Sequence, residues 1–276
     1  MVGIAVVGAV AYLALMPKGA GPHEPSEDVT DGLTESESHL ATVFLVGEWV
    51  EVDVMIDDDR KWSGSGVIVA EDGPSLIVMT NAHCLGVKDI LDGQIETPDI
   101  AQFALGIATS QSDKIRKVTQ FALCKHRGLD VALVRVPREG LRQGVDYAVA
   151  PIFNRRVAKR GVDVVAIGAP RRLRGTETFG RVSAIREPGE LSPHPLIQTD
   201  AALNQGNSGG PLYAVIAGKR QLVGLNTFGL RDSEGLNFAF FADEYHANDW
   251  MWFDANPAGA VAALKAIHGI DAEVAK

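Results

Sequence analysis

Short apolar runs separated by Gly, Pro, Asp and Asn dominate the sequence from residue 40 onward. Runs of this length, rich in Val and Ile, are typical of β-strands in an all-β barrel or sandwich. Three aspartates at 57–59 stand between two such runs and predict a hairpin turn. The expected strands are Thr42–Val46, Trp49–Ile56, Gly66–Ala70, Leu76–Met79, Val131–Val136, Val162–Ile167, Gln221–Thr227 and Phe238–Phe241.

Residues 1–16 form a separate unit, because Val2–Met16 carries no charge and consists mainly of Val, Ala, Gly, Leu and Ile. As a helix this stretch would span about 23 Å, which is short of a hydrocarbon core of about 30 Å. No basic residue precedes it, and no clear small-x-small cleavage site follows it. We therefore predict an uncleaved signal anchor in the membrane, with a cleaved signal peptide or a buried N-terminal element as alternatives. Both signal-type alternatives place the rest of the chain outside the cytoplasm, in the periplasm or at the cell surface.

Two further segments flank the region of strands. Residues 17–39 hold six acidic residues, three prolines and three glycines against one lysine, and this composition predicts an acidic disordered linker. Residues 246–276 are expected to form a helical tail. Its alanine-rich stretch 257–268 predicts a helix that ends near Gly269.

The overall composition excludes several classes of protein. The chain has 276 residues, of which 46% are hydrophobic and 22% charged, as in an ordinary globular protein. A net charge of −9 without an offsetting basic cluster argues against nucleic acid as a partner. The histidines and cysteines show no His-x-x-x-His or Cys-x-x-Cys spacing, so we expect neither a metal nor another cofactor.

The most informative motif is the loop at residues 204–210, in which Ser208 is surrounded by Gly206, Gly209 and Gly210. Glycines allow a tight backbone turn and let N–H groups converge on one point, as an oxyanion hole requires. A serine is a weak nucleophile at neutral pH and needs a base beside it. A plain Gly/Ser surface turn is the alternative.

A base and an acid that could serve Ser208 occur upstream. His83 ends an apolar strand, and its unperturbed pKa of about 6.5 suits a general base. Asp130 opens another apolar strand, where a buried carboxylate needs a partner such as an imidazole N–H. A histidine satisfied in a turn and a loop aspartate are the alternatives, but three such sites in the order His, Asp, Ser favour catalysis.

Several stretches of the sequence resemble the motifs of chymotrypsin-fold, or trypsin-like, serine proteases. Within that clan the chain is most similar to the HtrA/Deg branch. The stretches that resemble the clan are residues 80–83, 130–133 and 206–211, and those that resemble the branch are residues 164–170, 180–185 and 197–204.

The resemblance covers residues 40–245 and implies two six-stranded antiparallel β-barrels, at about 40–142 and 150–245, with the active site between them. A short C-terminal helix and the N-terminal hydrophobic segment would lie outside the barrels. Many HtrA relatives carry a peptide-binding PDZ domain after the protease. Too few residues follow position 245 for such a domain, so we expect this chain to lack one. HtrA relatives are often trimers, and the resemblance leaves the oligomeric state of this chain open.

The resemblance also implies roles for the catalytic residues. Ser208 would attack a peptide carbonyl, His83 would transfer the proton, and Asp130 would hold the imidazole in place. The N–H groups of Gly206 and Ser208 would bind the oxyanion, with Asn207 shaping the turn between them.

The substrate pocket is expected at matching positions. Ala202 would form its floor, Thr227, Phe228 and Gly229 one wall, and the stretch Leu236–Phe238 the other, unless Leu236 and Phe238 belong to the core of the second barrel. No Asp or Glu matches the floor, so we expect cleavage after small or medium apolar residues, in exposed or misfolded protein segments.

Two alternatives to a peptidase stay open, namely a protease-like module that captures unfolded chains without cutting, and a hydrolase such as an esterase. A disulfide between Cys84 and Cys124 is also left open, because many chymotrypsin relatives pair the cysteine after the histidine with a preceding one, which is missing here.

Overall fold

The computed structural model describes most of the expected strand region. The described residues are 32–49, 61–85, 103–109, 114–126, 128–230, 233–244 and 249–256, together with residues 259, 262, 263 and 266. The expectations for the N-terminal segment 1–16, for the linker up to residue 31 and for the turn at 57–59 lie outside these residues.

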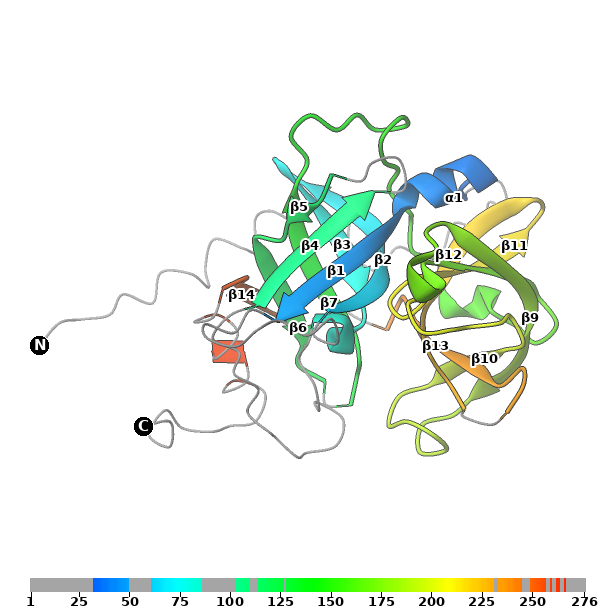
Figure 1. Cartoon of the computed structure of the whole chain (residues 1–276). Coiled ribbons are helices and arrows are strands. Elements are labelled where there is room, and N and C mark those ends of the chain that lie inside the picture. Colours follow the sequence, from blue (N-terminus) through cyan, green and yellow to red (C-terminus); the bar gives the residue numbers. More distant parts are fainter. Residues whose placement is uncertain are drawn as a thin grey trace, which may run out of the picture.

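The first half of the chain, together with β14 near the C-terminus, forms an antiparallel sheet of eight strands in the order β14-β6-β7-β3-β2-β1-β4-β5 (Figure 1). At its centre, β3 is buried along its whole length, as its uninterrupted apolar run leads one to expect. The strands are β1 (Thr42–Trp49), β2 (Lys61–Asp72), β3 (Ser75–Thr80), β4 (Phe103–Thr109), β5 (Arg116–Lys117), β6 (Gln120–Cys124), β7 (Ala132–Pro137) and β14 (Trp250–Asp254).

The second half forms a closed six-stranded barrel in the order β10-β13-β12-β11-β8-β9. Its inward-facing side chains, among them Leu212, Val223 and Ala239, form a separate apolar core. The strands are β8 (Asp163–Gly168), β9 (Thr176–Arg186), β10 (Leu196–Thr199), β11 (Pro211–Ile216), β12 (Lys219–Gly229) and β13 (Asn237–Phe241). The expected all-β double-barrel fold is confirmed, although the first sheet has eight strands and not six.

Every strand expected from the sequence coincides with an observed one, except that of 49–56 only Trp49 is described, at the end of β1. The expectation of a helical tail over 246–276 is wrong for residues 250–254, which pair with β6 as β14. Large side chains explain the difference, because they favour strands and pack across the sheet. The rings of Phe253 and Phe121, for example, lie 5.5 Å apart.

The disordered linker expected over 17–39 overlaps an ordered helix, α1 (Glu35–Ala41). A capping box begins this helix: Glu37 N–H donates to the Thr34 hydroxyl, and Thr34 N–H donates to the Glu37 carboxylate. The buried guanidinium of Arg220 fixes the helix to the second barrel, since it pairs with Glu177 and donates to Ser38 Oγ at 2.8 Å. A local cap and a distant cation therefore order residues whose polar composition had indicated disorder.

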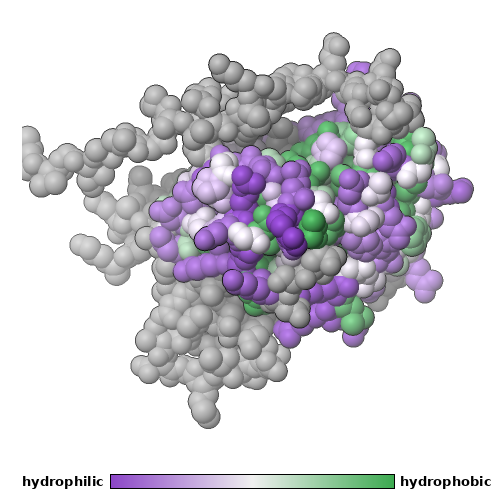
Figure 2. Space-filling view, turned by 90° about the horizontal axis from the view of Figure 1, so that it is seen from above, coloured by the Kyte–Doolittle hydropathy of each residue, from purple (hydrophilic) through white to green (hydrophobic). Residues whose placement is uncertain are grey.

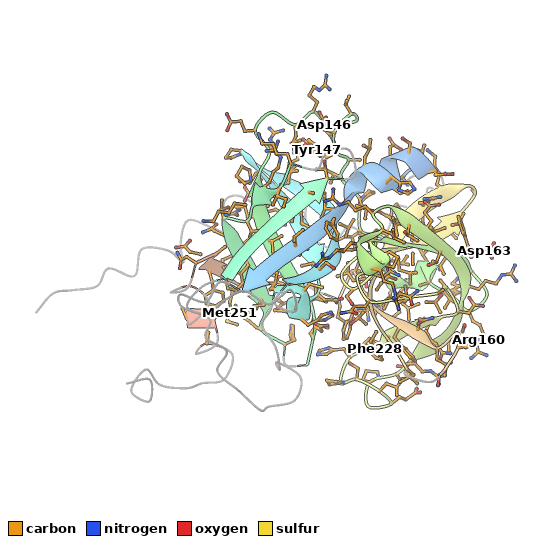
Figure 3. The ribbon with its side chains drawn as sticks, in the orientation of Figure 1. Asp146, Tyr147, Arg160, Asp163, Phe228 and Met251 are labelled. Carbon is orange, nitrogen blue, oxygen red and sulfur yellow. The ribbon has the colours of Figure 1, made fainter. Side chains whose placement is uncertain are left out.

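The segment between the two barrels is bonded to both of them. Tyr147 is fully buried and its hydroxyl donates to Glu71 of β2 at 2.6 Å. Ala150 N–H donates to Ile68 O at 2.8 Å, and Phe153 N–H donates to Leu222 O of the second barrel at 2.9 Å. Figure 3 shows Tyr147 at the top of the first barrel. These bonds set the relative position of the two barrels, on which the site between them depends.

The surface seen from above in Figure 2 is mostly hydrophilic over the described residues, with small apolar groups between the polar side chains. Within the part of the chain that the structure describes, no helix has both the length and the apolar character needed to cross a membrane.

Candidate active site

His83 and Asp130 lie beside each other because the strands next to them are neighbours. His83 lies in the 3-10 turn Ala82–Leu85, just after β3, and Asp130 lies just before β7. Thr80 at the end of β3 is paired with Ala132 at the start of β7, which brings the adjoining turns together. His83 Nδ1 lies 2.6 Å from Asp130 Oδ2, and the His83 backbone N–H donates to Asp130 Oδ1 at 2.9 Å.

Two further contacts hold Asp130, which is only 5% exposed. Asn81 Nδ2 donates to its backbone carbonyl at 2.7 Å, and the Thr227 hydroxyl donates to its Oδ2 at 3.3 Å. A buried carboxylate is stable only when its oxygens are hydrogen-bonded. Here the donors come from both barrels, because Thr227 lies on β12.

The pKa of His83 is raised, which favours the protonated imidazole. Burial of the ring lowers the pKa of His83, but the Cys84 thiol and the Asp130 carboxylate raise it more, so that it lies well above its ordinary value. The side chain is still 44% exposed, so a substrate could reach it. Since Nδ1 is bonded to Asp130, Nε2 is the ring nitrogen left to exchange protons.

Ser208 lies in the loop between β10 and β11 and is connected to His83 and Asp130 through neighbouring residues. Its hydroxyl donates to the Thr227 carbonyl at 3.2 Å, and the hydroxyl of the same threonine donates to Asp130. In addition, the Cys84 thiol next to His83 donates to Ser208 O at 3.4 Å. The structure therefore brings the three predicted residues to one place between the barrels.

Among the described residues, four N–H groups of this loop donate no hydrogen bond, those of Asn204, Gln205, Gly206 and Ser208. Asn207 N–H donates to Asn204 O at 2.9 Å, Gly209 N–H to Asn226 O at 2.8 Å, and Gly210 N–H to Asn207 O at 3.0 Å. Among the hydrogen bonds of the described residues, neither Gly206 N–H nor Ser208 N–H donates one. These are the two donors expected to bind an oxyanion.

Gly206 is needed for this backbone conformation. Its φ of +103° lies in a region that side chains with a Cβ rarely adopt. A Cβ there would lie 2.3 Å from Ala169 O, which is backbone and has no room to move aside.

Of the residues expected to line the substrate pocket, four are at least partly exposed and the others are buried. Ala202 and Gly229 are exposed, and Phe228 and Leu236 are partly buried. Phe228 stacks on Phe238, with ring centroids 4.9 Å apart. Thr227, by contrast, is buried and directs its hydroxyl to Asp130, so its side chain supports the carboxylate and does not form a pocket wall. Figure 3 shows Phe228 at the edge of the second barrel that faces the first, with Asp163 at the opposite edge.

Sequence reasoning missed one residue of the site. Ser65 of β2 is fully buried and contacts the loop of Ser208 through both its hydroxyl and its backbone N–H. Asn237 lies within the expected wall at 236–238, and its Nδ2 donates to Ala201 O at 3.0 Å. The signal at Ser65 is a polar residue between two glycines inside an apolar strand, since Gly64 and Gly66 flank it.

Both cysteines are free and buried, so the disulfide left open by the sequence does not form in this structure. Within the described ranges, no three His, Cys, Asp or Glu side chains are grouped so that they could hold a metal ion.

Comparison with known proteins finds a peptidase family model and relatives that are named serine proteases. Residues 64–225 match the trypsin-like peptidase domain. Serine protease HTRA1B of Danio rerio is 31% identical over 213 residues, which are 75% of this chain and 38% of that protein. Serine protease HTRA1 of Xenopus laevis is 34% identical over 187 residues, which are 66% of this chain and 34% of that protein. The chain thus spans little more than a third of the length of these relatives, and the expected similarity to the HtrA branch is confirmed.

Solved structures give the same fold. The HtrA-type protease AlgW with a bound tripeptide matches 75% of this chain and 58% of its own chain, with a TM-score of 0.54 and 24% sequence identity. The family match extends over more than half of the sequence and includes His83, Asp130 and Ser208. The chain therefore belongs to the family of trypsin-like peptidase domains.

Proposed function

We propose that this chain is a serine endopeptidase that hydrolyses peptide bonds in exposed or misfolded protein segments. The observation that carries the proposal is the convergence of His83, Asp130 and Ser208 beside Gly206 N–H and Ser208 N–H, which donate no hydrogen bond among the described residues. Membership of the peptidase family and the names of the relatives, which are serine proteases, support it.

The reaction would begin when the Ser208 hydroxyl turns from the Thr227 carbonyl toward His83 Nε2. As Ser208 Oγ bonds to the substrate carbonyl carbon, Nε2 takes its proton, and Asp130 stabilises the imidazolium. The carbonyl oxygen, now negative, accepts hydrogen bonds from Gly206 N–H and Ser208 N–H. His83 then protonates the amine nitrogen as the C–N bond breaks, and a water activated by His83 hydrolyses the acyl-enzyme.

The strand β12 supports binding of an extended peptide. Its pairing with β11 ends at Leu225, whereas its pairing with β13 continues to Gly229. One edge of residues 227–229 is therefore left for a substrate strand, whose backbone would pair with it while pockets select side chains. A tripeptide and a decapeptide are bound in the AlgW structures, which accords with a peptide ligand here.

None of the residues expected to line the pocket, all of which the structure describes, carries a carboxylate. Asp200 is the acidic residue nearest in sequence to Ala202, but its Oδ1 accepts a hydrogen bond from Arg181 N–H at 2.6 Å. This supports the preference for small or medium apolar residues such as Val, Ala, Ile or Leu before the cleaved bond.

Replacing Ser208 by Ala should abolish both turnover of a denatured protein substrate and labelling by a fluorophosphonate probe. Without the nucleophile, kcat should fall by on the order of 10⁶. Ser36→Ala, which changes an exposed serine of α1, is the control and should keep both activities. A folded wild-type protein that binds denatured protein but neither cuts it nor takes up the probe would favour the non-cutting alternative. Turnover of simple esters without peptide cleavage would favour an esterase.

The pH dependence should reflect His83, which must be neutral to accept the proton. Because its pKa is raised well above the ordinary value, kcat/KM should rise with pH through a midpoint above about 6.5. Asp130→Asn should lower that midpoint and reduce kcat by about 10⁴. Rate profiles and NMR titration of the imidazole would measure both effects, and a midpoint below 6.5 would contradict the assigned environment of His83.

Peptides that differ only in the residue before the cleaved bond should reveal the pocket. Burying a Lys or Arg side chain without a partner costs several kcal/mol, so kcat/KM for Val, Ala or Leu should exceed that for Lys or Arg by about 10² or more. Cleavage of a peptide library, read by mass spectrometry, tests this. A preference for basic residues would show that a carboxylate reaches the pocket after all.

We also propose that the first 16 residues carry the catalytic part out of the cytoplasm and anchor it in the membrane. The uncharged stretch Val2–Met16 supports this. When the full chain is expressed in cells, an externally added protease should digest the catalytic part, and deletion of residues 2–16 should leave it protected inside. Protection of the full-length chain would refute the proposal.

A further inference from the structure

The loop around Ser208 is held through its carbonyl groups, and Ser65 binds two of them. The Ser65 hydroxyl donates to Gly206 O at 2.7 Å, and the Ser65 backbone N–H donates to Ser208 O at 2.8 Å. Ser65 belongs to β2 of the first barrel, so these bonds cross from one barrel to the other. The two carbonyls belong to Gly206 and Ser208, whose N–H groups donate no hydrogen bond among the described residues.

The carbonyls of Gln205 and Asn207 are held by other groups. Gln205 O accepts a hydrogen bond from Arg171 N–H at 2.9 Å, and Asn207 O accepts one from Gly210 N–H at 3.0 Å. Thus each carbonyl from 205 to 208 has a donor. Two side chains donate to these carbonyls. The Ser65 hydroxyl lies 2.7 Å from Gly206 O, whereas the Cys84 thiol lies 3.4 Å from Ser208 O and is a weak donor.

The direction of the Ser65 hydroxyl proton is set by its surroundings. Ser65 is fully buried, and its Oγ accepts a hydrogen bond from Ala169 N–H at 3.0 Å. The Ser65 carbonyl in turn accepts the Thr80 hydroxyl at 2.7 Å. With one N–H already pointing at Oγ, the single hydroxyl proton is left for Gly206 O.

We propose that Ser65 is a positioning residue for the oxyanion hole, an inference that rests on the proposed function. Gly206, like Gly209 and Gly210, has no side chain to restrict the rotation of its backbone. The bond from Ser65 to Gly206 O fixes the rotation of the Gly206–Asn207 peptide, which joins the peptide that carries Gly206 N–H to the peptide that carries Ser208 N–H. Gly206 N–H and Ser208 N–H are thereby kept pointing at one place, ready for the charge that develops on the substrate oxygen.

Ser65→Ala tests the proposal, because it removes the bond to Gly206 O and leaves the Ser65 backbone N–H in place. Ser38→Ala is a matched control: Ser38 is also fully buried, donates to one backbone carbonyl, Glu35 O, and accepts one N–H donor, from Arg220. Both variants should therefore lower the midpoint of urea unfolding, but only the first touches the loop of Ser208.

With a tetrapeptide p-nitroanilide that presents valine before the scissile bond, Ser65→Ala should lower kcat about tenfold or more and change KM less than about threefold. This split is the signature of an interaction made in the transition state. Inhibition by the matching peptide boronate, which forms a tetrahedral adduct with the serine, should weaken by a similar factor. Ser38→Ala should leave both values near those of the wild type.

Equal kcat values for Ser65→Ala and Ser38→Ala would overturn the inference and leave the proposed function standing. A wild-type protein without turnover would overturn the proposed function and the inference with it. If Ser65→Ala does not fold, Ser65→Cys gives the same comparison, since it keeps the shape but has a weaker donor. Its kcat should fall below that of the wild type, and an unchanged kcat would again overturn the inference.

Discussion

The hydrogen bond of 2.6 Å between His83 Nδ1 and Asp130 Oδ2 is the interaction on which the proposed chemistry depends. It exists because β3 and β7 are neighbours in one sheet, but it is completed from the other barrel. A carboxylate that is 5% exposed must have its oxygens bonded, and the hydroxyl of Thr227 on β12 supplies one of the donors. A displacement of the second barrel would thus leave Asp130 partly unpaired. The hydrogen bonds of the Asp130 carboxylate therefore depend on the packing of the two barrels, which the segment from Tyr147 to Phe153 helps to maintain because it is bonded to both.

A second constraint is steric and explains why the loop of Ser208 is rich in glycine. A Cβ at Gly206, Gly209 or Gly210 would lie 2.3, 2.1 and 2.3 Å from Ala169 O, the Thr80 hydroxyl and Ile167 O respectively. Two of these three contacts are with backbone, which cannot move without disturbing β8 and the turn that follows it. The loop therefore packs closely against both barrels, and these contacts restrict its backbone conformation. Glycine at these positions allows the close approach through which the carbonyls find their donors.

The strands and the three catalytic candidates could be predicted because their signals are local: apolar runs of strand length, a histidine after one run, an aspartate before another, and a serine among glycines. The missed elements depend on distant partners. Helix α1 is fixed by Arg220, and β14 by β6, and neither partner is evident from the neighbouring sequence. Thr227 was expected in the pocket because of its place in the motif. Only the fold shows that its hydroxyl faces Asp130 while the next residue, Phe228, stacks on Phe238.

Cys84, the residue after His83, packs against Gly64 of β2 without forming a disulfide. A Cβ added at Gly64 would lie 2.6 Å from Cys84 Sγ, so the thiol already fills the space that a side chain on β2 would need. Cys84 also donates weakly to Ser208 O, at 3.4 Å, and Ser65 N–H donates to the same carbonyl. Cys124 lies at the end of β6, and burial raises the pKa of its thiol, which favours the protonated form. Cys84 therefore connects the turn that carries His83 to β2 by packing and to the loop of Ser208 by a weak hydrogen bond, so that contact between these three segments does not depend on a covalent bond.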